Sequence, residues 1–269
     1  MIRRRFISGD WTSKEVQSLQ KLGIKVSIGY SNFIIEEGET YNRLERLLKN
    51  HRGKLTNIYT SSVFTVKEIN DSDYLSIILA NKGYPQPQQN IESYREKTFE
   101  INCSSCGYKD KQITSFRIKD EPKWKKNEVL FSLYWEYDSV FVKKEFYEKI
   151  FRPLNIDHRD VLIHKSGKVA ETVVQLIPPI SPSSLLMKDS WYSKHAETTN
   201  CCNRIRYTST IGDFLPSFEF NPNISICLTQ EIFGSEGNAF RKIIVNKKIF
   251  NLLVERETIN KLTSAPLSK

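Results

Sequence analysis

Cys103, Cys106 and Gly107 form a Cys-x-x-Cys-Gly motif in the stretch FEINCSSCGYKDKQ. Two thiolates at this spacing can bind one tetrahedral zinc ion, and a following glycine permits the backbone bend that such a turn needs. A redox pair is an alternative, but thioredoxin-like motifs begin a helix, whose dipole lowers the thiol pKa, whereas these cysteines lie in strand-like sequence. A tight turn without metal is the other alternative. We interpret the motif as half of a structural zinc site.

A tetrahedral site needs two ligands beyond this first pair. The stretch TTNCCNRIRY supplies Cys201 and Cys202. Because adjacent cysteines can both bind one metal only with a strained local backbone, we expect Cys202 to be a ligand and leave the fourth position open between Cys201 and His195. A metal-free arrangement of buried, reduced cysteines is the alternative. Cys227 alternates with apolar residues in NISICLTQ, which predicts a core position.

The Cys-x-x-Cys-Gly motif, the second cysteine pair followed by NRIRY, and the closing segment EIFGSEGNAFRKIIVNKKIFNLLVE together resemble the bacterial double-CXXCG motif proteins. Many of these are described as immunity proteins of polymorphic toxins. The similarity spans residues 97 to 256. It implies a cytoplasmic, non-enzymatic protein that binds and neutralises a cognate protein toxin, with a zinc ion held by both cysteine sites.

The second cysteine site departs from the pattern of that family. Thr199 stands where a first cysteine is expected, and Asn203 stands in place of the glycine. Asparagine adopts the left-handed conformation more readily than other non-glycine residues, so the turn itself can persist.

Composition is that of a globular protein with a sizeable core. The chain has 269 residues, of which 39% are hydrophobic and 12% aromatic. No apolar stretch approaches the roughly 20 residues of a membrane helix. The amino-terminal segment lacks the apolar region and cleavage site of a secretory signal. These features predict a cytoplasmic protein without a membrane partner.

The net charge admits two kinds of partner. Lys and Arg number 40 against 31 Asp and Glu, a formal charge of +9, which suits nucleic-acid binding. The cations are nevertheless dispersed in short groups beside apolar residues, as on solvated surfaces, and a basic face also suits an acidic protein. We expect a protein partner, and keep a zinc-ribbon nucleic-acid-binding protein as the alternative. A nucleic-acid groove would depend on lysines in two of these groups: Lys125, Lys126, Lys143 and Lys144.

The sequence gives little support to catalysis. No motif of a zinc protease, a P-loop nucleotide hydrolase or an α/β-hydrolase is present. The remaining enzymatic alternative is a metal-dependent nuclease, in which Asp110 and Glu121 would hold Mg²⁺ and Lys123 would lie near a phosphate. Because an acid followed two positions later by lysine is common in charged loops, we expect no enzymatic activity.

Apolar spacing predicts an α+β fold, mainly antiparallel sheet with packed helices and the cysteine knuckle at one end. Helices are predicted at residues 42–51, from a Thr65–Glu68 capping box to Gly83, and at 143–151. Strands are predicted at 98–103, 112–119, 128–137 and 168–177. The cysteine motif lies between the first two strands, so it should cap a hairpin.

The proline-rich stretch YPQPQQN, residues 84–90, is predicted to be extended. It suggests a domain boundary. The chain is accordingly divided into an amino-terminal α+β segment over residues 1–90 and a double-CXXCG-like α+β domain over residues 91–269.

Overall fold

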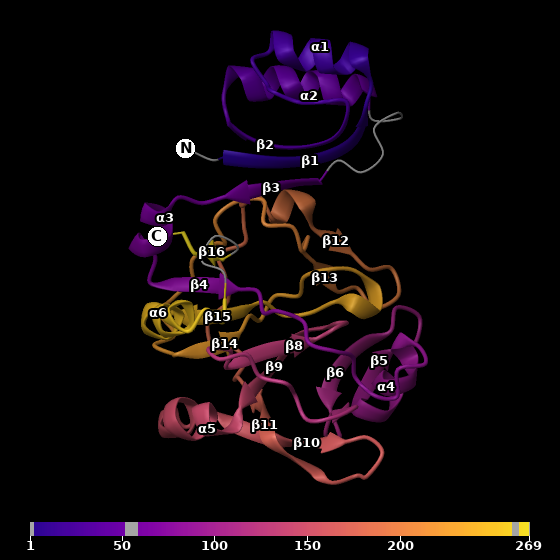
Figure 1. Ribbon diagram of the computed structural model, residues 1–269, viewed down its shortest axis with the longest axis vertical. Coiled ribbons are helices and arrows are strands. Elements are labelled where there is room, and N and C mark those ends of the chain that lie inside the picture. Colours follow the sequence, from indigo (N-terminus) through magenta and orange to yellow (C-terminus); the bar gives the residue numbers. More distant parts are fainter. Residues whose placement is uncertain (1–2, 52–58, 260–263, 269) are drawn as a thin grey trace. The chain divides into compact units, whose positions relative to one another are not determined.

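The computed structural model describes residues 3–51, 59–259 and 264–268 (Figure 1). Helices are combined with mainly antiparallel sheets, which confirms the predicted α+β class. The chain forms two compact units. Unit 1 lies within residues 1–70 and 210–214, and unit 2 lies within residues 71–209 and 215–269. Among the described residues, no helix combines the length and apolar character that crossing a bilayer requires.

Unit 1 is a three-stranded antiparallel sheet, in the order β2–β1–β3, with two helices along it (Figure 1). Its elements are β1 (Arg3–Trp11), α1 (Ser13–Lys21), β2 (Gly29–Glu36), α2 (Glu39–His51) and β3 (Tyr59–Val63). The predicted helix at 42–51 is confirmed by α2, where Leu44 is fully buried. It packs with Phe6, Trp11 and Leu19, so the apolar stripe of the helix meets the apolar face of the sheet.

The helix predicted from Thr65 to Gly83 is correct only at its start. Thr65 and Glu68 form the capping box, since the Thr65 amide donates to the Glu68 carboxylate at 2.6 Å and the Glu68 amide donates to Thr65 Oγ1 at 3.0 Å. Helix α3 (Val66–Asp71) ends soon after. The next residues form strand β4 (Tyr74–Ile77), which pairs with a strand on each side. The consecutive residues Leu75, Ser76 and Ile77 are all buried, so both faces of the strand are covered, and such an apolar run also fits a buried helix.

Unit 2 contains a five-stranded sheet in the order β7–β10–β11–β9–β8 and a four-stranded sheet in the order β14–β15–β4–β16. Only β10 and β7 pair in parallel among the described strands. The remaining strands of these sheets are β7 (Arg117–Ile118), β8 (Leu130–Leu133), β9 (Glu136–Lys143), β10 (Asp157–Ile163), β11 (Val169–Ile177), β14 (Ile226–Leu228), β15 (Ile243–Asn246) and β16 (Ala265–Pro266). The helical elements are α4 (Ile91–Thr98), α5 (Lys144–Phe146), which continues as a π-helix over Tyr147–Phe151, and α6 (Lys247–Glu255).

The predicted central strand at 128–137 is a hairpin. Strand β8 ends at Leu133, Trp135 takes a positive φ of 71°, and β9 begins at Glu136. None of the usual turn residues marks this reversal, so the apolar and aromatic sequence predicts a single continuous strand. Tyr84 stacks on Tyr134 with ring centroids 4.5 Å apart, and this contact holds the turn in place.

The two units divide between Asn70 and Asp71, and not at residue 90 as predicted. Strand β4 already belongs to the four-stranded sheet of unit 2. The proline-rich stretch is not extended throughout as predicted, because the chain bends at Gln86, Pro87, Gln89 and Asn90. It packs into unit 2: Pro85 is buried and the Gln86 amide donates to the Arg117 carbonyl at 2.9 Å. A stretch tied down in this way lies inside a unit and does not separate two.

Candidate metal centre

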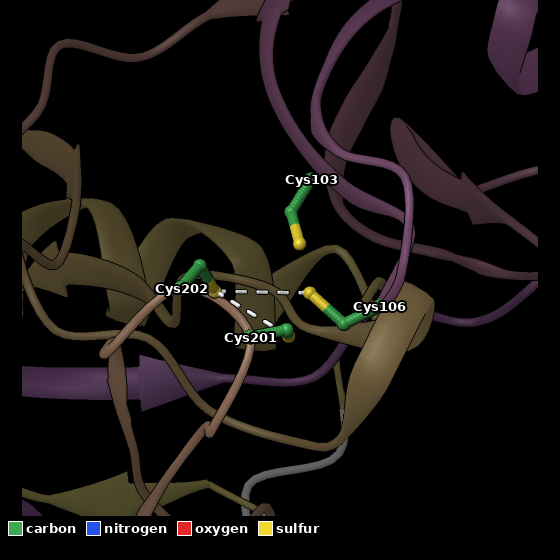
Figure 2. Close-up of side chains that lie close together, drawn as sticks. All are labelled: Cys103, Cys106, Cys201 and Cys202. Carbon is green, nitrogen blue, oxygen red and sulfur yellow. Dashed lines mark hydrogen bonds between the residues drawn. The ribbon is translucent and has the colours of Figure 1, made fainter.

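The two cysteine motifs lie at the tips of two hairpins of unit 2. The first hairpin is β5 (Phe99–Cys103) with β6 (Tyr108–Gln112), and the second is β12 (Glu197–Thr198) with β13 (Ile205–Arg206). The predicted hairpin around the first motif is therefore confirmed, although its second strand is β6 and not residues 112–119. Figure 2 shows the side chains of both pairs converging from the two loops.

The four sulfur atoms of Cys103, Cys106, Cys201 and Cys202 lie within 4.8 Å of one another. Cys202 Sγ is 3.9 Å from Cys106 Sγ and 4.0 Å from Cys201 Sγ (Figure 2). All four are free thiols. Their separation is far longer than the roughly 2.05 Å of a disulfide. The cluster could therefore hold one metal ion.

Cys201, and not His195, completes this cluster. The His195 ring stacks on Trp191 with ring centroids 4.0 Å apart, and its Nδ1 lies 2.8 Å from the Trp191 carbonyl oxygen. In the described part of the chain, no histidine joins the group of sulfur atoms. The adjacent cysteines reach the same point because Asn203 takes a positive φ of 51°, the left-handed conformation predicted for it, and turns the loop back.

Thr199, at the start of the second cysteine loop, supports Cys202. Its Oγ1 lies 3.0 Å from Cys202 Sγ and accepts a hydrogen bond from the Arg204 amide at 3.1 Å. The Asn203 amide donates to the Thr199 carbonyl at 2.9 Å, which closes the loop. The Thr199 hydroxyl lowers the pKa of the Cys202 thiol to about 7. This thiol therefore loses its proton near neutral pH, as metal binding requires.

The other three thiols differ in acidity. A hydrogen bond from the Cys106 backbone lowers the pKa of Cys103, whereas burial raises the pKa of Cys106. Hydrogen bonding to the Cys103 sulfur raises the pKa of Cys201 to about 12. Cys103 and Cys202 are thus the more acidic thiols of the cluster, and a bound cation would displace the protons that the cluster still carries.

An apolar cluster supports the first hairpin, and a cation–π contact joins this hairpin to the second. Cys103 and Cys106 pack against Tyr108, Ile232 and Ala239. The Arg204 guanidinium lies over the Tyr108 ring, 4.1 Å from its centroid, so the loop of the second hairpin is held against a strand of the first.

Asn203 offers a test of the loop geometry. Asn203→Gly is expected to retain full metal content, because glycine adopts a positive φ at no steric cost. Asn203→Val is expected to lower metal affinity at least about fivefold, because a β-branched residue in this conformation costs about 1–3 kcal/mol. Competition with a chromophoric chelator measures both affinities. Equal affinities would show that the left-handed turn does not position the cysteines.

The other predicted positions serve the fold. Cys227 is fully buried in the core, as predicted. The Glu121 carboxylate accepts hydrogen bonds from the Glu171 amide at 2.5 Å and from Thr172 Oγ1 at 2.6 Å, so it is bound to strand β11. Glu121 belongs to no group of metal-ligating side chains among the residues that the structure describes, and the Asp110 side chain lies outside the described ones.

A basic pocket of about 320 Å³ lies elsewhere in unit 2 and was not predicted. Its lining includes the cations Lys109, Lys111, Arg159 and Arg241 but only one acid, Asp138. Lys109 and Lys111 share strand β6, whereas Arg159 lies in β10 and Arg241 just before β15, so no single charge run in the sequence signals the whole group. They are also distinct from the four lysines that the sequence had suggested for nucleic-acid binding.

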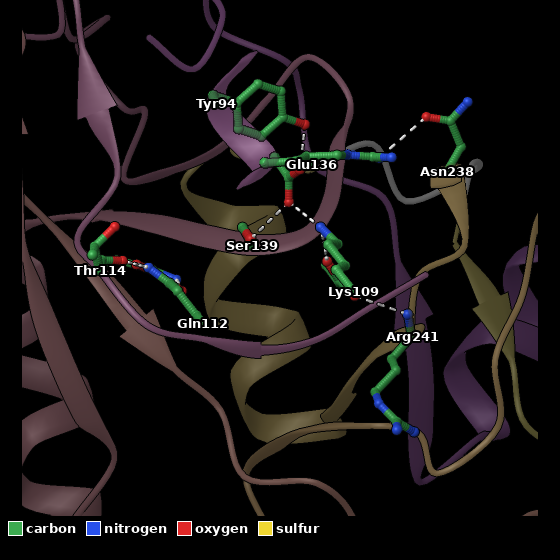
Figure 3. Close-up of polar contacts among 11 residues, drawn as sticks. Tyr94, Lys109, Gln112, Thr114, Glu136, Ser139, Asn238 and Arg241 are labelled. Carbon is green, nitrogen blue, oxygen red and sulfur yellow. Dashed lines mark hydrogen bonds and ion pairs between the residues drawn. The ribbon is translucent and has the colours of Figure 1, made fainter. Parts of the chain in front are cut away.

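Glu136 anchors one wall of this pocket (Figure 3). Its fully buried carboxylate accepts hydrogen bonds from the Tyr94 hydroxyl and from Lys109 Nζ, with Ser139 Oγ at 3.5 Å. Lys109 Nζ lies also 3.6 Å from the Asp138 carboxylate. Lys109 is thereby neutralised within the protein. In the described residues, neither the Arg159 nor the Arg241 guanidinium has a carboxylate within 4.0 Å, although the Arg241 backbone amide donates to the Asp138 carboxylate at 3.1 Å.

Comparison with known proteins yields one partial similarity. A stretch of 103 residues is 30% identical to "Maturase-like protein 1" of Euglena longa. It covers 37% of this chain and 23% of that protein, so the chain spans less than a quarter of its relative. No family model matches the chain, and no solved structure matches it.

Proposed function

We propose that this chain is a zinc-stabilised immunity protein that acts in the bacterial cytoplasm and neutralises a cognate protein toxin by covering its active surface. The observation that carries the proposal is the meeting of Cys103 and Cys106 with Cys201 and Cys202 in one cluster. Such a joint site is what the resemblance to double-CXXCG motif proteins implies, even though the second motif is degenerate.

Zinc is the metal that suits this donor set. Four thiolates are soft ligands, which favour zinc over the oxygen-binding cations. A tetrahedral ion with Zn–S bonds of roughly 2.3 Å separates its sulfur ligands by about 3.8 Å. The distances of 3.9 and 4.0 Å around Cys202 are close to this value. Four protein ligands leave no open position, so the ion would be structural.

The basic pocket is the proposed contact surface for the toxin. The guanidinium groups of Arg159 and Arg241 donate to backbone carbonyls but have no ionic partner within the described residues. Apolar side chains such as Leu176 and the half-exposed Ile180 line the same pocket. Arginines beside apolar surface are typical of energetically important positions in protein interfaces. Charge complementarity indicates an acidic loop on the toxin.

The proposal predicts that this chain restores growth to a bacterial host expressing the toxin encoded beside its gene. Charge reversal in the double variant Arg159→Glu/Arg241→Glu is expected to weaken toxin binding at least about 30-fold, because hot-spot residues contribute about 2 kcal/mol or more. Calorimetry measures the affinity. Arg152→Glu is the control, since Arg152 is exposed on another part of unit 2 and should leave binding unchanged. Absence of both rescue and binding with the unmodified chain would contradict immunity.

A nucleic-acid-binding protein is the second candidate, favoured by the formal charge of +9 and by the same two arginines. Fluorescence anisotropy with a labelled single strand and a labelled duplex separates the two candidates. Immunity predicts no binding of either at physiological salt. Binding that weakens steeply with salt and is lost in the Arg159→Glu/Arg241→Glu variant would favour the second candidate.

A further inference from the structure

A second pocket of unit 2, of about 440 Å³, lies beside strands β4 and β15, which are neighbours in the four-stranded sheet. Much of its wall is apolar, with Ile77, Leu79, Phe240 and Ile243 among the lining side chains. Lys242 is the only cation that lines it, and no Asp or Glu of the described residues does so. We call it the Lys242 pocket.

Lys242 is buried without a counter-ion. The residue is 6% exposed, and none of the described carboxylates lies within 4.0 Å of its Nζ. Nζ is 3.5 Å from the carbonyl oxygen of Ser209, another lining residue, and 4.7 Å from the centroid of the Phe233 ring. A contact at the outer limit of hydrogen bonding and an aromatic face compensate only partly for the lost hydration of an ammonium group.

Lys109 provides the comparison within the same unit. It is 9% exposed, nearly as buried as Lys242, but its ammonium is paired with the Glu136 carboxylate and lies 3.6 Å from that of Asp138. Lysines are rarely buried unless they are paired. Burial lowers the pKa of Lys242 to about 8, so the side chain still carries its charge at neutral pH. The pocket therefore holds a positive charge whose partner the described residues do not supply.

We propose that the Lys242 pocket binds a small monocarboxylate, with its carboxylate paired to Lys242 Nζ and its apolar body against Leu79, Phe240 and Ile243. A single ammonium matches a single negative charge, whereas recognition of phosphate generally uses several donors. Ser235 and Asn238 line the same pocket and offer hydroxyl and amide donors for the second carboxylate oxygen. The volume is that of a small-molecule site, and most of the surface that lines the pocket is apolar, as is usual at such sites.

Titration of the full chain with sodium phenylacetate, followed by heteronuclear NMR and calorimetry, tests this assignment. Phenylacetamide is the matched probe, because it keeps the apolar body and removes the charge. We expect the amide to bind at least about tenfold more weakly, since a hydrogen bond to a charged group contributes about 1.5–3 kcal/mol. Chemical-shift changes are expected at residues of β4 and β15.

Lys242→Met is expected to weaken phenylacetate binding at least about tenfold, because the carboxylate loses its ammonium partner. The same variant is expected to raise the melting temperature of the free protein, because it removes a buried charge that has no counter-ion. Lys242→Arg retains the charge and should retain binding. Lys248→Met is the control, because Lys248 is exposed on α6 and should leave both quantities unchanged. Should Lys242→Met fail to fold, the acid and amide probes on the unmodified chain still decide the matter.

Three outcomes would overturn the assignment. The first is equal affinity for phenylacetate and phenylacetamide, and the second is undiminished phenylacetate binding to a folded Lys242→Met variant. The third is no binding by the unmodified chain at about 10 mM phenylacetate, a concentration well above the roughly 1 mM dissociation constant of a weak site. A short peptide with one aspartate, acetyl-Ala-Asp-Ala-amide, distinguishes the source of the carboxylate. Tighter binding of this peptide than of phenylacetate would replace the small acid by an acidic segment of a protein.

Discussion

Serine in place of Cys103, Cys106 or Cys202 is expected to abolish stoichiometric zinc binding and to destabilise unit 2 by at least about 3 kcal/mol. A ligand present at 100 times its dissociation constant already stabilises the folded state by about 2.7 kcal/mol, and thiolate coordination of zinc is generally tighter than this condition requires. The zinc would also join two hairpins that are distant in sequence, and its loss would separate them. Elemental analysis of native protein should find one zinc per chain, and thermal unfolding should give the stability.

Three further variants make this result specific. Cys201→Ser should also empty the site, whereas His195→Ala should retain the metal, because the His195 ring is engaged with Trp191. Cys227→Ala should lower stability through core packing but keep one zinc per chain, since this thiol is buried away from the cluster.

Zinc affinity should fall as the pH is lowered through 7, because the Cys202 thiol then regains its proton. Substoichiometric zinc, together with unchanged melting of the Cys103 and Cys106 variants, would refute the zinc site.

Lys109→Met is expected to destabilise unit 2 by about 3–5 kcal/mol, because it leaves the Glu136 carboxylate buried without its cation. The Tyr94 and Ser139 hydroxyls would still contact the carboxylate, but neither carries a positive charge (Figure 3). Denaturant unfolding with fluorescence detection measures the free energy of unfolding.

Two comparisons isolate the buried charge as the cause. The double variant Lys109→Met/Glu136→Leu should recover much of the loss, since replacing both members of a buried ion pair by apolar residues is often nearly neutral. Arg152→Met removes one partner of the exposed Arg152–Glu148 pair and should cost no more than about 0.5 kcal/mol. A loss for Lys109→Met as small as that for Arg152→Met would mean that water reaches the Glu136 carboxylate.

The sequence by itself determined the features that depend on neighbouring residues. The spacing of Cys103 and Cys106 indicates a metal-binding turn at a hairpin tip, the Thr65–Glu68 pair specifies a helix start, and an asparagine at position 203 suits a left-handed turn. Each of these involves contacts within a few positions along the chain. Short-range geometry and side-chain chemistry are enough to decide them.

Only the tertiary structure decided the features that depend on distant residues. Residues 74–77 became a strand because β15 and β16 flank them, and Cys201 became the fourth member of the cluster because two hairpins meet there. The same holds for the gathering of Arg159 and Arg241 around one pocket and for the burial of Lys242. In sequence, Lys242 is a lysine beside an apolar run, as many surface lysines are. Its burial depends on the packing of segments far apart in the chain, which local periodicity does not encode.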